Sequence, residues 1–153
     1  MAETYTVSRS TTIDAPSERI HPLLNDFRRW REWSPWEGLD PDMKRVYGGS
    51  DSGPGATYEW SGNRRAGKGR MRIATSTPTE VGIDLAFDKP FKSENRTTFT
   101  LVPRGGATDV TWSMTGRNNA VMRLLGKVMS MDKMIGKDYD KGLANLKAVA
   151  ERG

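Results

Sequence analysis

The chain has 153 residues and a formal net charge of +5, and 35% of its residues are apolar against 28% charged. Its 5 Trp, 4 Tyr, 4 Phe and 8 Met are large contact-forming side chains that disordered chains lack, so we expect one folded domain over residues 1–153. With no cysteine, disulfide scaffolds, thiolate catalysis and zinc fingers are excluded, and a single histidine leaves almost nothing from which to build a catalytic triad or a histidine-based metal site.

The first predicted elements are a strand and a broken helix. Residues 4–13 are β-branched, aromatic and loosely alternating, which predicts a strand. The proline and acidic residues at 14–18 are typical of a helix start. Because Pro22 removes a backbone hydrogen bond within two turns, we expect a kinked or broken pair of short helices up to about Trp33. Their inner face carries the apolar residues Ile20, Leu23, Leu24 and Phe27.

Residues 43–116 predict strands separated by turns. Gly, Pro, Asn and Asp clusters recur at short intervals, and the stretches between them alternate in polarity. In the stretch 81–87, for example, Val81, Ile83, Leu85 and Phe87 occupy one face. Six such segments and the first strand predict about seven antiparallel strands with one apolar face.

Residues from about 119 to 151 contain no proline and predict a long helix. At about 100° per residue, one sector holds its apolar residues: Met131, Ile135, Tyr139, Leu143, Leu146, Val149 and Ala150. Gly126, Gly136 and Gly142 each cost roughly 1 kcal/mol relative to Ala in a helix, which indicates a break near Gly126 or a close approach by another element. We expect this helix to cover the apolar face of the sheet.

Several segments resemble the START / polyketide cyclase / pollen-allergen ligand-binding superfamily (SRPBCC), in its bacterial polyketide cyclase/dehydrase-like branch. They are Ile13-Asp14-Ala15-Pro16, residues 26–36 (DFRRWREWSPW), residues 131–139 (MDKMIGKDY) and residues 142–147 (GLANLK). The resemblance covers essentially the whole chain. It implies an α+β helix-grip fold, in which a curved antiparallel sheet wraps around a long C-terminal helix and encloses an elongated apolar cavity. The superfamily includes carriers, cyclases and chaperone co-regulators, so the fold does not decide the function.

The tryptophans and methionines are the candidate ligand contacts. An indole offers a large apolar face and one N–H donor, which suits a site that binds an apolar molecule and orients a polar group. We interpret Trp30 and Trp36 as side chains that close one end of the sheet, whereas for Trp60 and Trp112 packing and ligand contact both remain open. The methionines fit either a cavity or an ordinary core. The predicted ligand-binding residues face the interior: Trp33, Trp60, Met71, Phe87, Trp112, Met114, Met134, Ile135, Asp138, Tyr139 and Gly142.

Asp138 is the candidate catalytic residue. By helical-wheel arithmetic it lies on the flank of the apolar sector, about 70° from its centre, and Gly142, one turn later, leaves room beside it. A carboxylate partly withdrawn from water has a raised pKa and acts as a general acid or base, with Tyr139 and Asn145 as candidate hydrogen-bond partners. The alternative is that Asp138 pairs at the surface with a lysine of its own helix or a strand arginine.

The leading prediction is a cytoplasmic binding module without a membrane span, because the sequence shows no signal peptide and no run of about 18 apolar residues. It would enclose a small hydrophobic or amphipathic ligand, such as a lipid or an aromatic, polyketide-like metabolite, and would need no cofactor and no metal. One alternative is a cofactor-independent polyketide cyclase or aromatase that uses Asp138. Another is a protein-interaction adaptor that uses the basic hairpin from Arg64 to Arg72, where the lack of interleaved aromatics argues against nucleic acid. Ligand identity and oligomeric state are left open.

Overall fold

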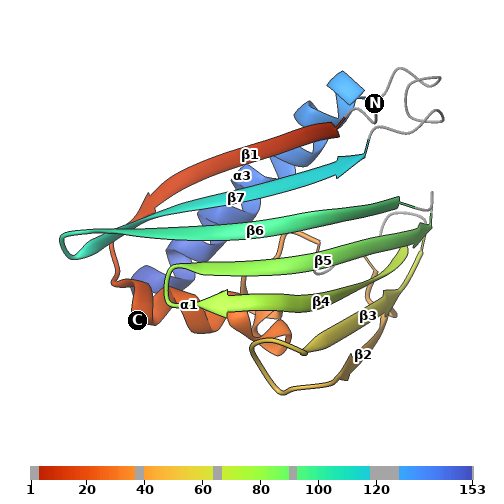
Figure 1. Cartoon of the computed structure of the whole chain (residues 1–153), viewed down its shortest axis with the longest axis horizontal. Coiled ribbons are helices and arrows are strands. Elements are labelled where there is room, and N and C mark those ends of the chain that lie inside the picture. The colour runs from red at the N-terminus through yellow and green to blue at the C-terminus, as the bar shows by residue number, and fades with distance from the viewer. Residues whose placement is uncertain (1–3, 37–39, 64–66, 90–92, 118–127, 153) are drawn as a thin grey trace.

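A curved antiparallel sheet wraps around one long helix in the computed structural model, which describes residues 4–36, 40–63, 67–89, 93–117 and 128–152 (Figure 1). The strands are β1 (Thr4–Ile13), β2 (Lys44–Gly48), β3 (Thr57–Ser61), β4 (Lys68–Thr77), β5 (Glu80–Lys89), β6 (Ser93–Arg104) and β7 (Ala107–Arg117). They form a 7-stranded sheet in the order β1-β7-β6-β5-β4-β3-β2. The helices are α1 (Ser17–Asn25), the 3-10 helix η1 (Phe27–Glu32) and α3 (Val128–Arg152). The predicted α+β helix-grip architecture is thereby confirmed.

The break between the two short helices comes later than the proline predicts. Pro22 lies inside α1, which continues to Asn25, and the chain leaves helical geometry at Asp26. The carboxylate of Asp26 accepts a hydrogen bond from the backbone N–H of Arg28 at 3.0 Å and so caps η1. Burial of Leu23 and its apolar neighbours against the sheet offsets the lost backbone bond, so Pro22 is tolerated.

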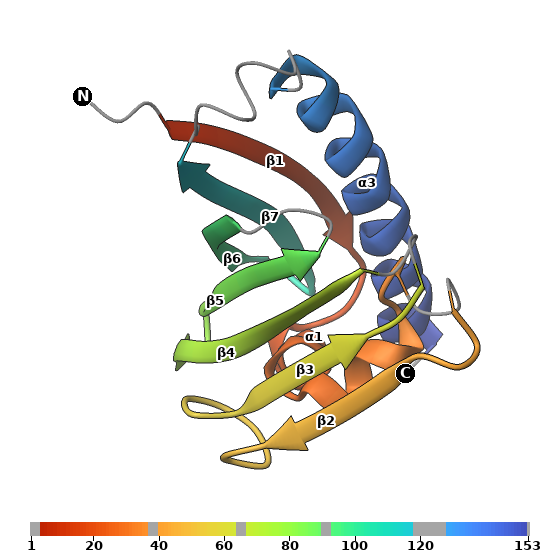
Figure 2. The same cartoon turned by 90° about the vertical axis from the view of Figure 1, so that its right-hand side faces the viewer.

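The sheet has one apolar face and one charged face, as the alternation in its strands predicts. On β5, Val81 and Ile83 face inward and are fully buried. Asp84, which directly follows Ile83 and faces the other side of the sheet, is exposed. On the outer face the guanidinium of Arg96 lies 2.9 Å from the carboxylate of Asp84. The apolar face is concave, and α1 and α3 cover it (Figure 2). The core therefore lies between the sheet and these helices.

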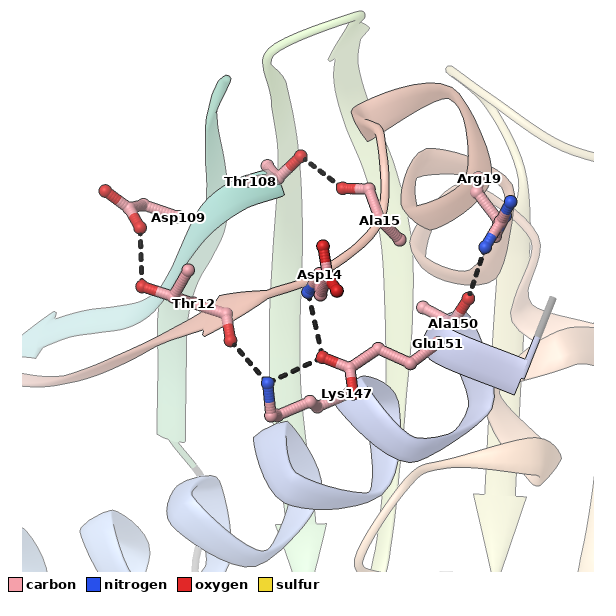
Figure 3. A network of polar contacts seen from close by, with 9 residues as sticks. All are labelled: Thr12, Asp14, Ala15, Arg19, Thr108, Asp109, Lys147, Ala150 and Glu151. Carbon is pink, nitrogen blue, oxygen red and sulfur yellow. Dashed lines mark hydrogen bonds and ion pairs between the residues drawn. The ribbon is translucent and has the colours of Figure 1, made fainter. Parts of the chain in front are cut away.

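Polar contacts fasten the C-terminal end of α3 (Figure 3). The Glu151 carboxylate accepts hydrogen bonds from the backbone N–H of Asp14 at 2.8 Å and from the ammonium of Lys147 at 2.6 Å. Lys147 Nζ also donates to a backbone carbonyl of β1 at 2.9 Å. From α1, Arg19 Nη1 donates to the carbonyl of Ala150 at 3.2 Å. These bonds fix where the last turns of α3 cross the end of β1.

Candidate ligand-binding site

Aromatic side chains fill the middle of the space between the sheet and α3. Trp33 and Trp112 are each 1% exposed. The Trp112 ring stacks on Tyr139 with ring centroids 3.8 Å apart, and it also stacks on Phe99, with centroids 5.0 Å apart. The indole N–H of Trp33 donates to the carbonyl of Leu23 at 2.9 Å. The contacts of Trp33 are core contacts, so its predicted contact with a ligand stays a prediction.

Trp30 and Trp36 close this aromatic cluster on the side of η1. Trp30 is buried, and its Nε1 donates to the carbonyl of Leu24 at 3.0 Å. Trp36 is half-buried and meets Trp112 and Tyr139 edge-on, with centroids 5.6 Å and 6.1 Å apart. Both rings thus pack against other aromatic side chains of the core, and that they close one end of the sheet stays a prediction.

Toward the opposite end of the strands, the inward-facing residues become progressively more exposed. Val81 and Ile83 on β5 are fully buried, whereas Leu85 and Phe87, next on the same face, are half-buried. The half-buried inward-facing residues at this end come from five elements: Tyr5 (β1), Trp60 (β3), Leu85 and Phe87 (β5), Asn95 (β6) and Ile135 (α3). We call these residues the open end. Side chains that are only partly buried, most of them apolar, therefore lie at this end of the sheet beside the packed core.

Two strand glycines let aromatic rings lie flat on the sheet at the open end. A Cβ on Gly69 would stand 2.6 Å from Cη2 of Trp60, and a Cβ on Gly116 would stand 2.6 Å from Oη of Tyr5. Each ring lies over the glycine that is its own register partner on the neighbouring strand. Trp60 thereby reaches across β4 to meet Phe87 edge-on, with ring centroids 5.6 Å apart.

A row of polar groups crosses this otherwise apolar face. The Tyr139 hydroxyl is hydrogen-bonded to Thr97, and the Tyr5 hydroxyl is hydrogen-bonded to Asn95. Thr97 Oγ1 donates to Asn95 Oδ1 at 3.4 Å, which joins the two pairs. Burial raises the pKa of both tyrosines above the ordinary value, so both phenols are neutral near pH 7. They can orient a polar group by hydrogen bonding but cannot serve as bases.

Sequence analysis missed three members of this row, Tyr5, Asn95 and Thr97. The available indication was their spacing: Asn95 and Thr97 share the strand face of Phe99 and Leu101, where polar side chains are unexpected. Met71 and Met114 do face the interior as predicted and are buried next to the open end, where Met71 is the register partner of Leu85. The side chain of Met134 lies outside the described residues.

Asp138 is half-buried on α3, one turn after Ile135 and one turn before Gly142. Within the described part of the chain, no hydrogen bond or ion pair joins its carboxylate to another residue. The space beside Gly142 is not empty, because a Cβ there would stand 2.7 Å from Cζ3 of Trp112 and 2.9 Å from Cδ of Pro35. The expectation that Gly142 leaves room beside Asp138 is therefore wrong.

The second candidate partner of Asp138 is engaged elsewhere. Asn145 Nδ2 donates to the backbone carbonyl of Trp33 at 3.1 Å, which ties α3 to the segment after η1. Tyr139, the other candidate, is bonded to Thr97. Neither side chain is thus committed to the carboxylate.

Part of the charge on the outer face of β4 and β5 is paired. Arg64 and Arg65 of the predicted basic hairpin lie outside the described residues, and the described Arg70 and Arg72 are exposed on the outer face. Arg70 Nη1 lies 3.4 Å from the carboxylate of Asp88. This acidic neighbour offsets the charge on which the adaptor hypothesis depends.

Neither a metal centre nor a membrane-spanning helix is found among the described residues. In the ranges that the structure describes, no group of three or more His, Asp or Glu side chains is placed to hold a metal ion. Over those ranges, no helix is long and apolar enough to span a bilayer.

Comparison with known proteins places the chain in a family. The family model described as "Polyketide cyclase / dehydrase and lipid transport" matches residues 4–151. The chain belongs to this family. The match confirms the resemblance to the SRPBCC superfamily and makes the chain a ligand-binding or polyketide cyclase-type domain in the broad sense of that description. No curated protein sequence matches the chain.

Solved structures of the family's fold are similar along the whole chain. Protein CV1439 from Chromobacterium violaceum is 18% identical with a TM-score of 0.68, over 95% of this chain and 96% of that one. Ara h 8.0201 is 13% identical with a TM-score of 0.69, over 99% and 100%. DynU16, a protein in the dynemicin biosynthetic locus, is 15% identical with a TM-score of 0.66, over 95% of this chain but 47% of that one. At these identities the likeness shows the helix-grip fold alone.

Proposed function

We propose that the chain binds a small, flat, hydrophobic or amphipathic molecule at the open end, between the sheet and α3. The observation that carries this proposal is the change in burial along single strand faces. Core residues such as Ile83 are fully buried, whereas Leu85 and Phe87 on the same face keep part of their apolar surface exposed. Exposed apolar surface on the concave face of a fold is a common basis for binding an apolar molecule.

The strength of such binding follows from the area that is covered. A ligand that loses about 300 Å² of apolar surface to this site gains about 7–8 kcal/mol at about 25 cal/mol per Å². Loss of translational and rotational freedom offsets several kcal/mol of that gain. The remaining few kcal/mol correspond to affinity in the millimolar range, so tighter binding needs a larger covered area or hydrogen bonds to the polar row.

The polar row supports an amphipathic ligand rather than a pure hydrocarbon. Tyr5, Asn95, Thr97 and Tyr139 place hydroxyl and amide groups beside apolar rings. A few convergent polar groups in an apolar surround orient a bound molecule and select for its polar substituents. Aromatic or polyketide-like metabolites with oxygen substituents fit this combination.

Titration with N-phenyl-1-naphthylamine, an uncharged fluorescent aromatic probe, tests the site. Leu85→Arg places a charge on the half-buried apolar surface, and we expect it to weaken probe binding at least tenfold. The matched control is Val102→Arg, because Val102 is 54% exposed on the outer face of the neighbouring strand. Equal affinity of both variants for the probe, or no binding by the unmodified protein, would contradict the proposed site. Native mass spectrometry of gently purified protein then identifies the natural ligand as an added mass that Leu85→Arg loses.

A second candidate is a cyclase or dehydratase acting on a polyketide-like substrate. The observation in its favour is the half-buried Asp138 carboxylate, which has no partner among the described residues and lies one turn from Ile135 of the open end. In this reaction Asp138 would move protons as a general acid or base. Asp138→Asn should abolish turnover of the ligand found by mass spectrometry and retain its binding. Unchanged turnover in that variant would remove Asp138 from the mechanism.

A further inference from the structure

The sheet is open, so it has two edge strands, β1 and β2. β2 is protected in the usual ways, because it is five residues long and carries two cations, Lys44 and Arg45. β1 is ten residues long and pairs with β7 in one uninterrupted register from Thr4 to Ile13. A long, regular edge strand without proline is a template for pairing with a strand of another chain.

The even-numbered residues of β1 turn their backbone polar groups toward the free edge. In an antiparallel pair, successive residues point these groups alternately toward the neighbouring strand and away from it. Thr12 indicates the alternation, because its carbonyl accepts a hydrogen bond from Lys147 of α3 at 2.9 Å (Figure 3). Asp14, just beyond the strand, follows the same alternation, and its N–H donates to Glu151 of α3 at 2.8 Å. Side chains of α3 thus occupy the edge at the C-terminal end of β1.

Arg9 occupies the middle of the same edge. Its Nη1 donates at 2.8 Å to the carbonyl of Ser8, one of the even-numbered residues. The guanidinium is held there by α3, because its Nε lies 3.6 Å from the carboxylate of Asp140 and it fills the space that a side chain at Gly136 would need. Arg9 is also the single charged residue in the strand sequence 4–13. It therefore occupies a backbone acceptor on an otherwise neutral edge.

We propose that the free edge of β1 is a pairing surface for a second copy of this chain, and that Arg9 keeps it closed in the unmodified protein. The two β1 strands run antiparallel about a two-fold axis at Val7, so that Thr6 of each copy pairs with Ser8 of the other. The paired segment is then 4–10, which avoids the end that α3 occupies. Arg9 opposes this pairing because the carbonyl of Ser8, which must accept from the N–H of Thr6 in the other copy, already accepts from the guanidinium.

A second copy suits this edge better than a foreign peptide does. Apart from Arg9, the side chains of residues 4–10 are neutral and mostly β-branched or aromatic, so they favour a strand and offer no charge by which to select a charged partner. In an antiparallel pair about a two-fold axis, each backbone donor of β1 meets an acceptor that β1 also supplies. The inference is independent of the proposed ligand.

Sedimentation velocity of Arg9→Thr tests the role of the guanidinium. Threonine removes the charge and has a high strand propensity, so the strand is retained. Because the paired segment is short and the interface small, the measurement extends to about 500 μM protein. We expect Arg9→Thr to dimerise about tenfold more tightly than the unmodified protein. The matched control is Arg96→Thr, which changes the charge equally and removes the ion pair with Asp84 on an interior strand, and it should sediment as the unmodified protein does.

Ser10→Pro in the Arg9→Thr background tests the geometry of the pairing. Proline removes an N–H that faces the free edge and leaves the bonds to β7 intact, so the double variant should lose the added dimerisation. In Arg9→Thr itself, amide exchange at Thr6 should slow as the protein concentration rises, whereas exchange at Val7, which faces β7, should not change. Equal association of Arg9→Thr and Arg96→Thr, or a dimer that survives Ser10→Pro, would overturn the inference. A tight dimer of the unmodified protein would overturn the role assigned to Arg9.

Discussion

Two glycines of α3 offer a sharp test of the packing between the helix and the sheet. Gly142 and Gly136 receive the same substitution, to alanine, in the same helix. A Cβ at Gly142 would meet Trp112 and Pro35, with 2.7 Å to the Trp112 ring, and both neighbours are rigid and held within the core. A Cβ at Gly136 would meet the guanidinium of Arg9, the far end of a flexible side chain.

The expected free energies of unfolding follow from two opposing effects. Each substitution gains about 1 kcal/mol of helix propensity. At Gly142, forcing the Trp112 ring aside costs about 2 kcal/mol through overpacking, so the variant should be about 1 kcal/mol less stable than the unmodified protein. At Gly136, displacing the flexible Arg9 side chain loosens its half-exposed ion pair with Asp140, whose atoms are 3.6 Å apart and whose loss costs about 0.5 kcal/mol.

Urea denaturation followed by tryptophan fluorescence measures both values, and thermal melts provide a second reading. For a domain of this size, Gly142→Ala should lower Tm by about 3 °C, and Gly136→Ala should raise it by about 2 °C. If Gly142→Ala proved as stable as Gly136→Ala, the close contact with Trp112 would not be the reason that residue 142 is glycine. A crystal structure of Gly142→Ala should also show the Trp112 ring displaced from Tyr139.

Two further predictions concern the core and the end of α3. Ile83→Ala should lower the free energy of unfolding by about 3 kcal/mol and Leu85→Ala by about 1 kcal/mol, because only Ile83 is fully buried; equal losses would contradict the open end. The hydrogen bond from Lys147 lowers the pKa of Glu151 below its ordinary 4.5, so its contribution to stability is complete above pH 4.5 and is lost as the pH falls through the lowered value. Urea midpoints measured from pH 6 to pH 2 should therefore fall less steeply for Glu151→Gln than for the control Glu80→Gln, and identical slopes would refute this assignment.

Local sequence patterns predicted the architecture because the period of apolar residues reports which face of an element is buried. The alternation in 81–87 and the one-sided apolar sector of 135–150 both reappear as buried faces. The pair of short helices expected up to about Trp33 is present, and the break falls at Asp26 rather than at the proline, because the packing of Leu23 keeps Pro22 inside α1. Tertiary burial overrides a single unfavourable residue when enough apolar area depends on the helix.

The candidate site was harder to predict, because its members come from distant strands. Tyr5 and Asn95 contact each other only because β1, β7 and β6 are neighbours in the sheet. Gly142 was predicted to leave empty space next to Asp138, but the Trp112 ring occupies the space that a side chain at residue 142 would need. A helical wheel gives the direction of a side chain and contains no information about which residue of the sheet meets it.

The amino-acid sequence by itself determines which segments form strands and helices and which face of each is apolar. It does so because propensity and periodicity act over a few neighbouring positions. Only the folded structure decides how deeply each inward-facing residue is buried, which aromatic rings stack, and which indole N–H groups donate a hydrogen bond to a backbone carbonyl. Those properties depend on contacts between residues far apart in the chain, such as Trp112 with Tyr139, and such contacts exist only once the sheet curves around α3.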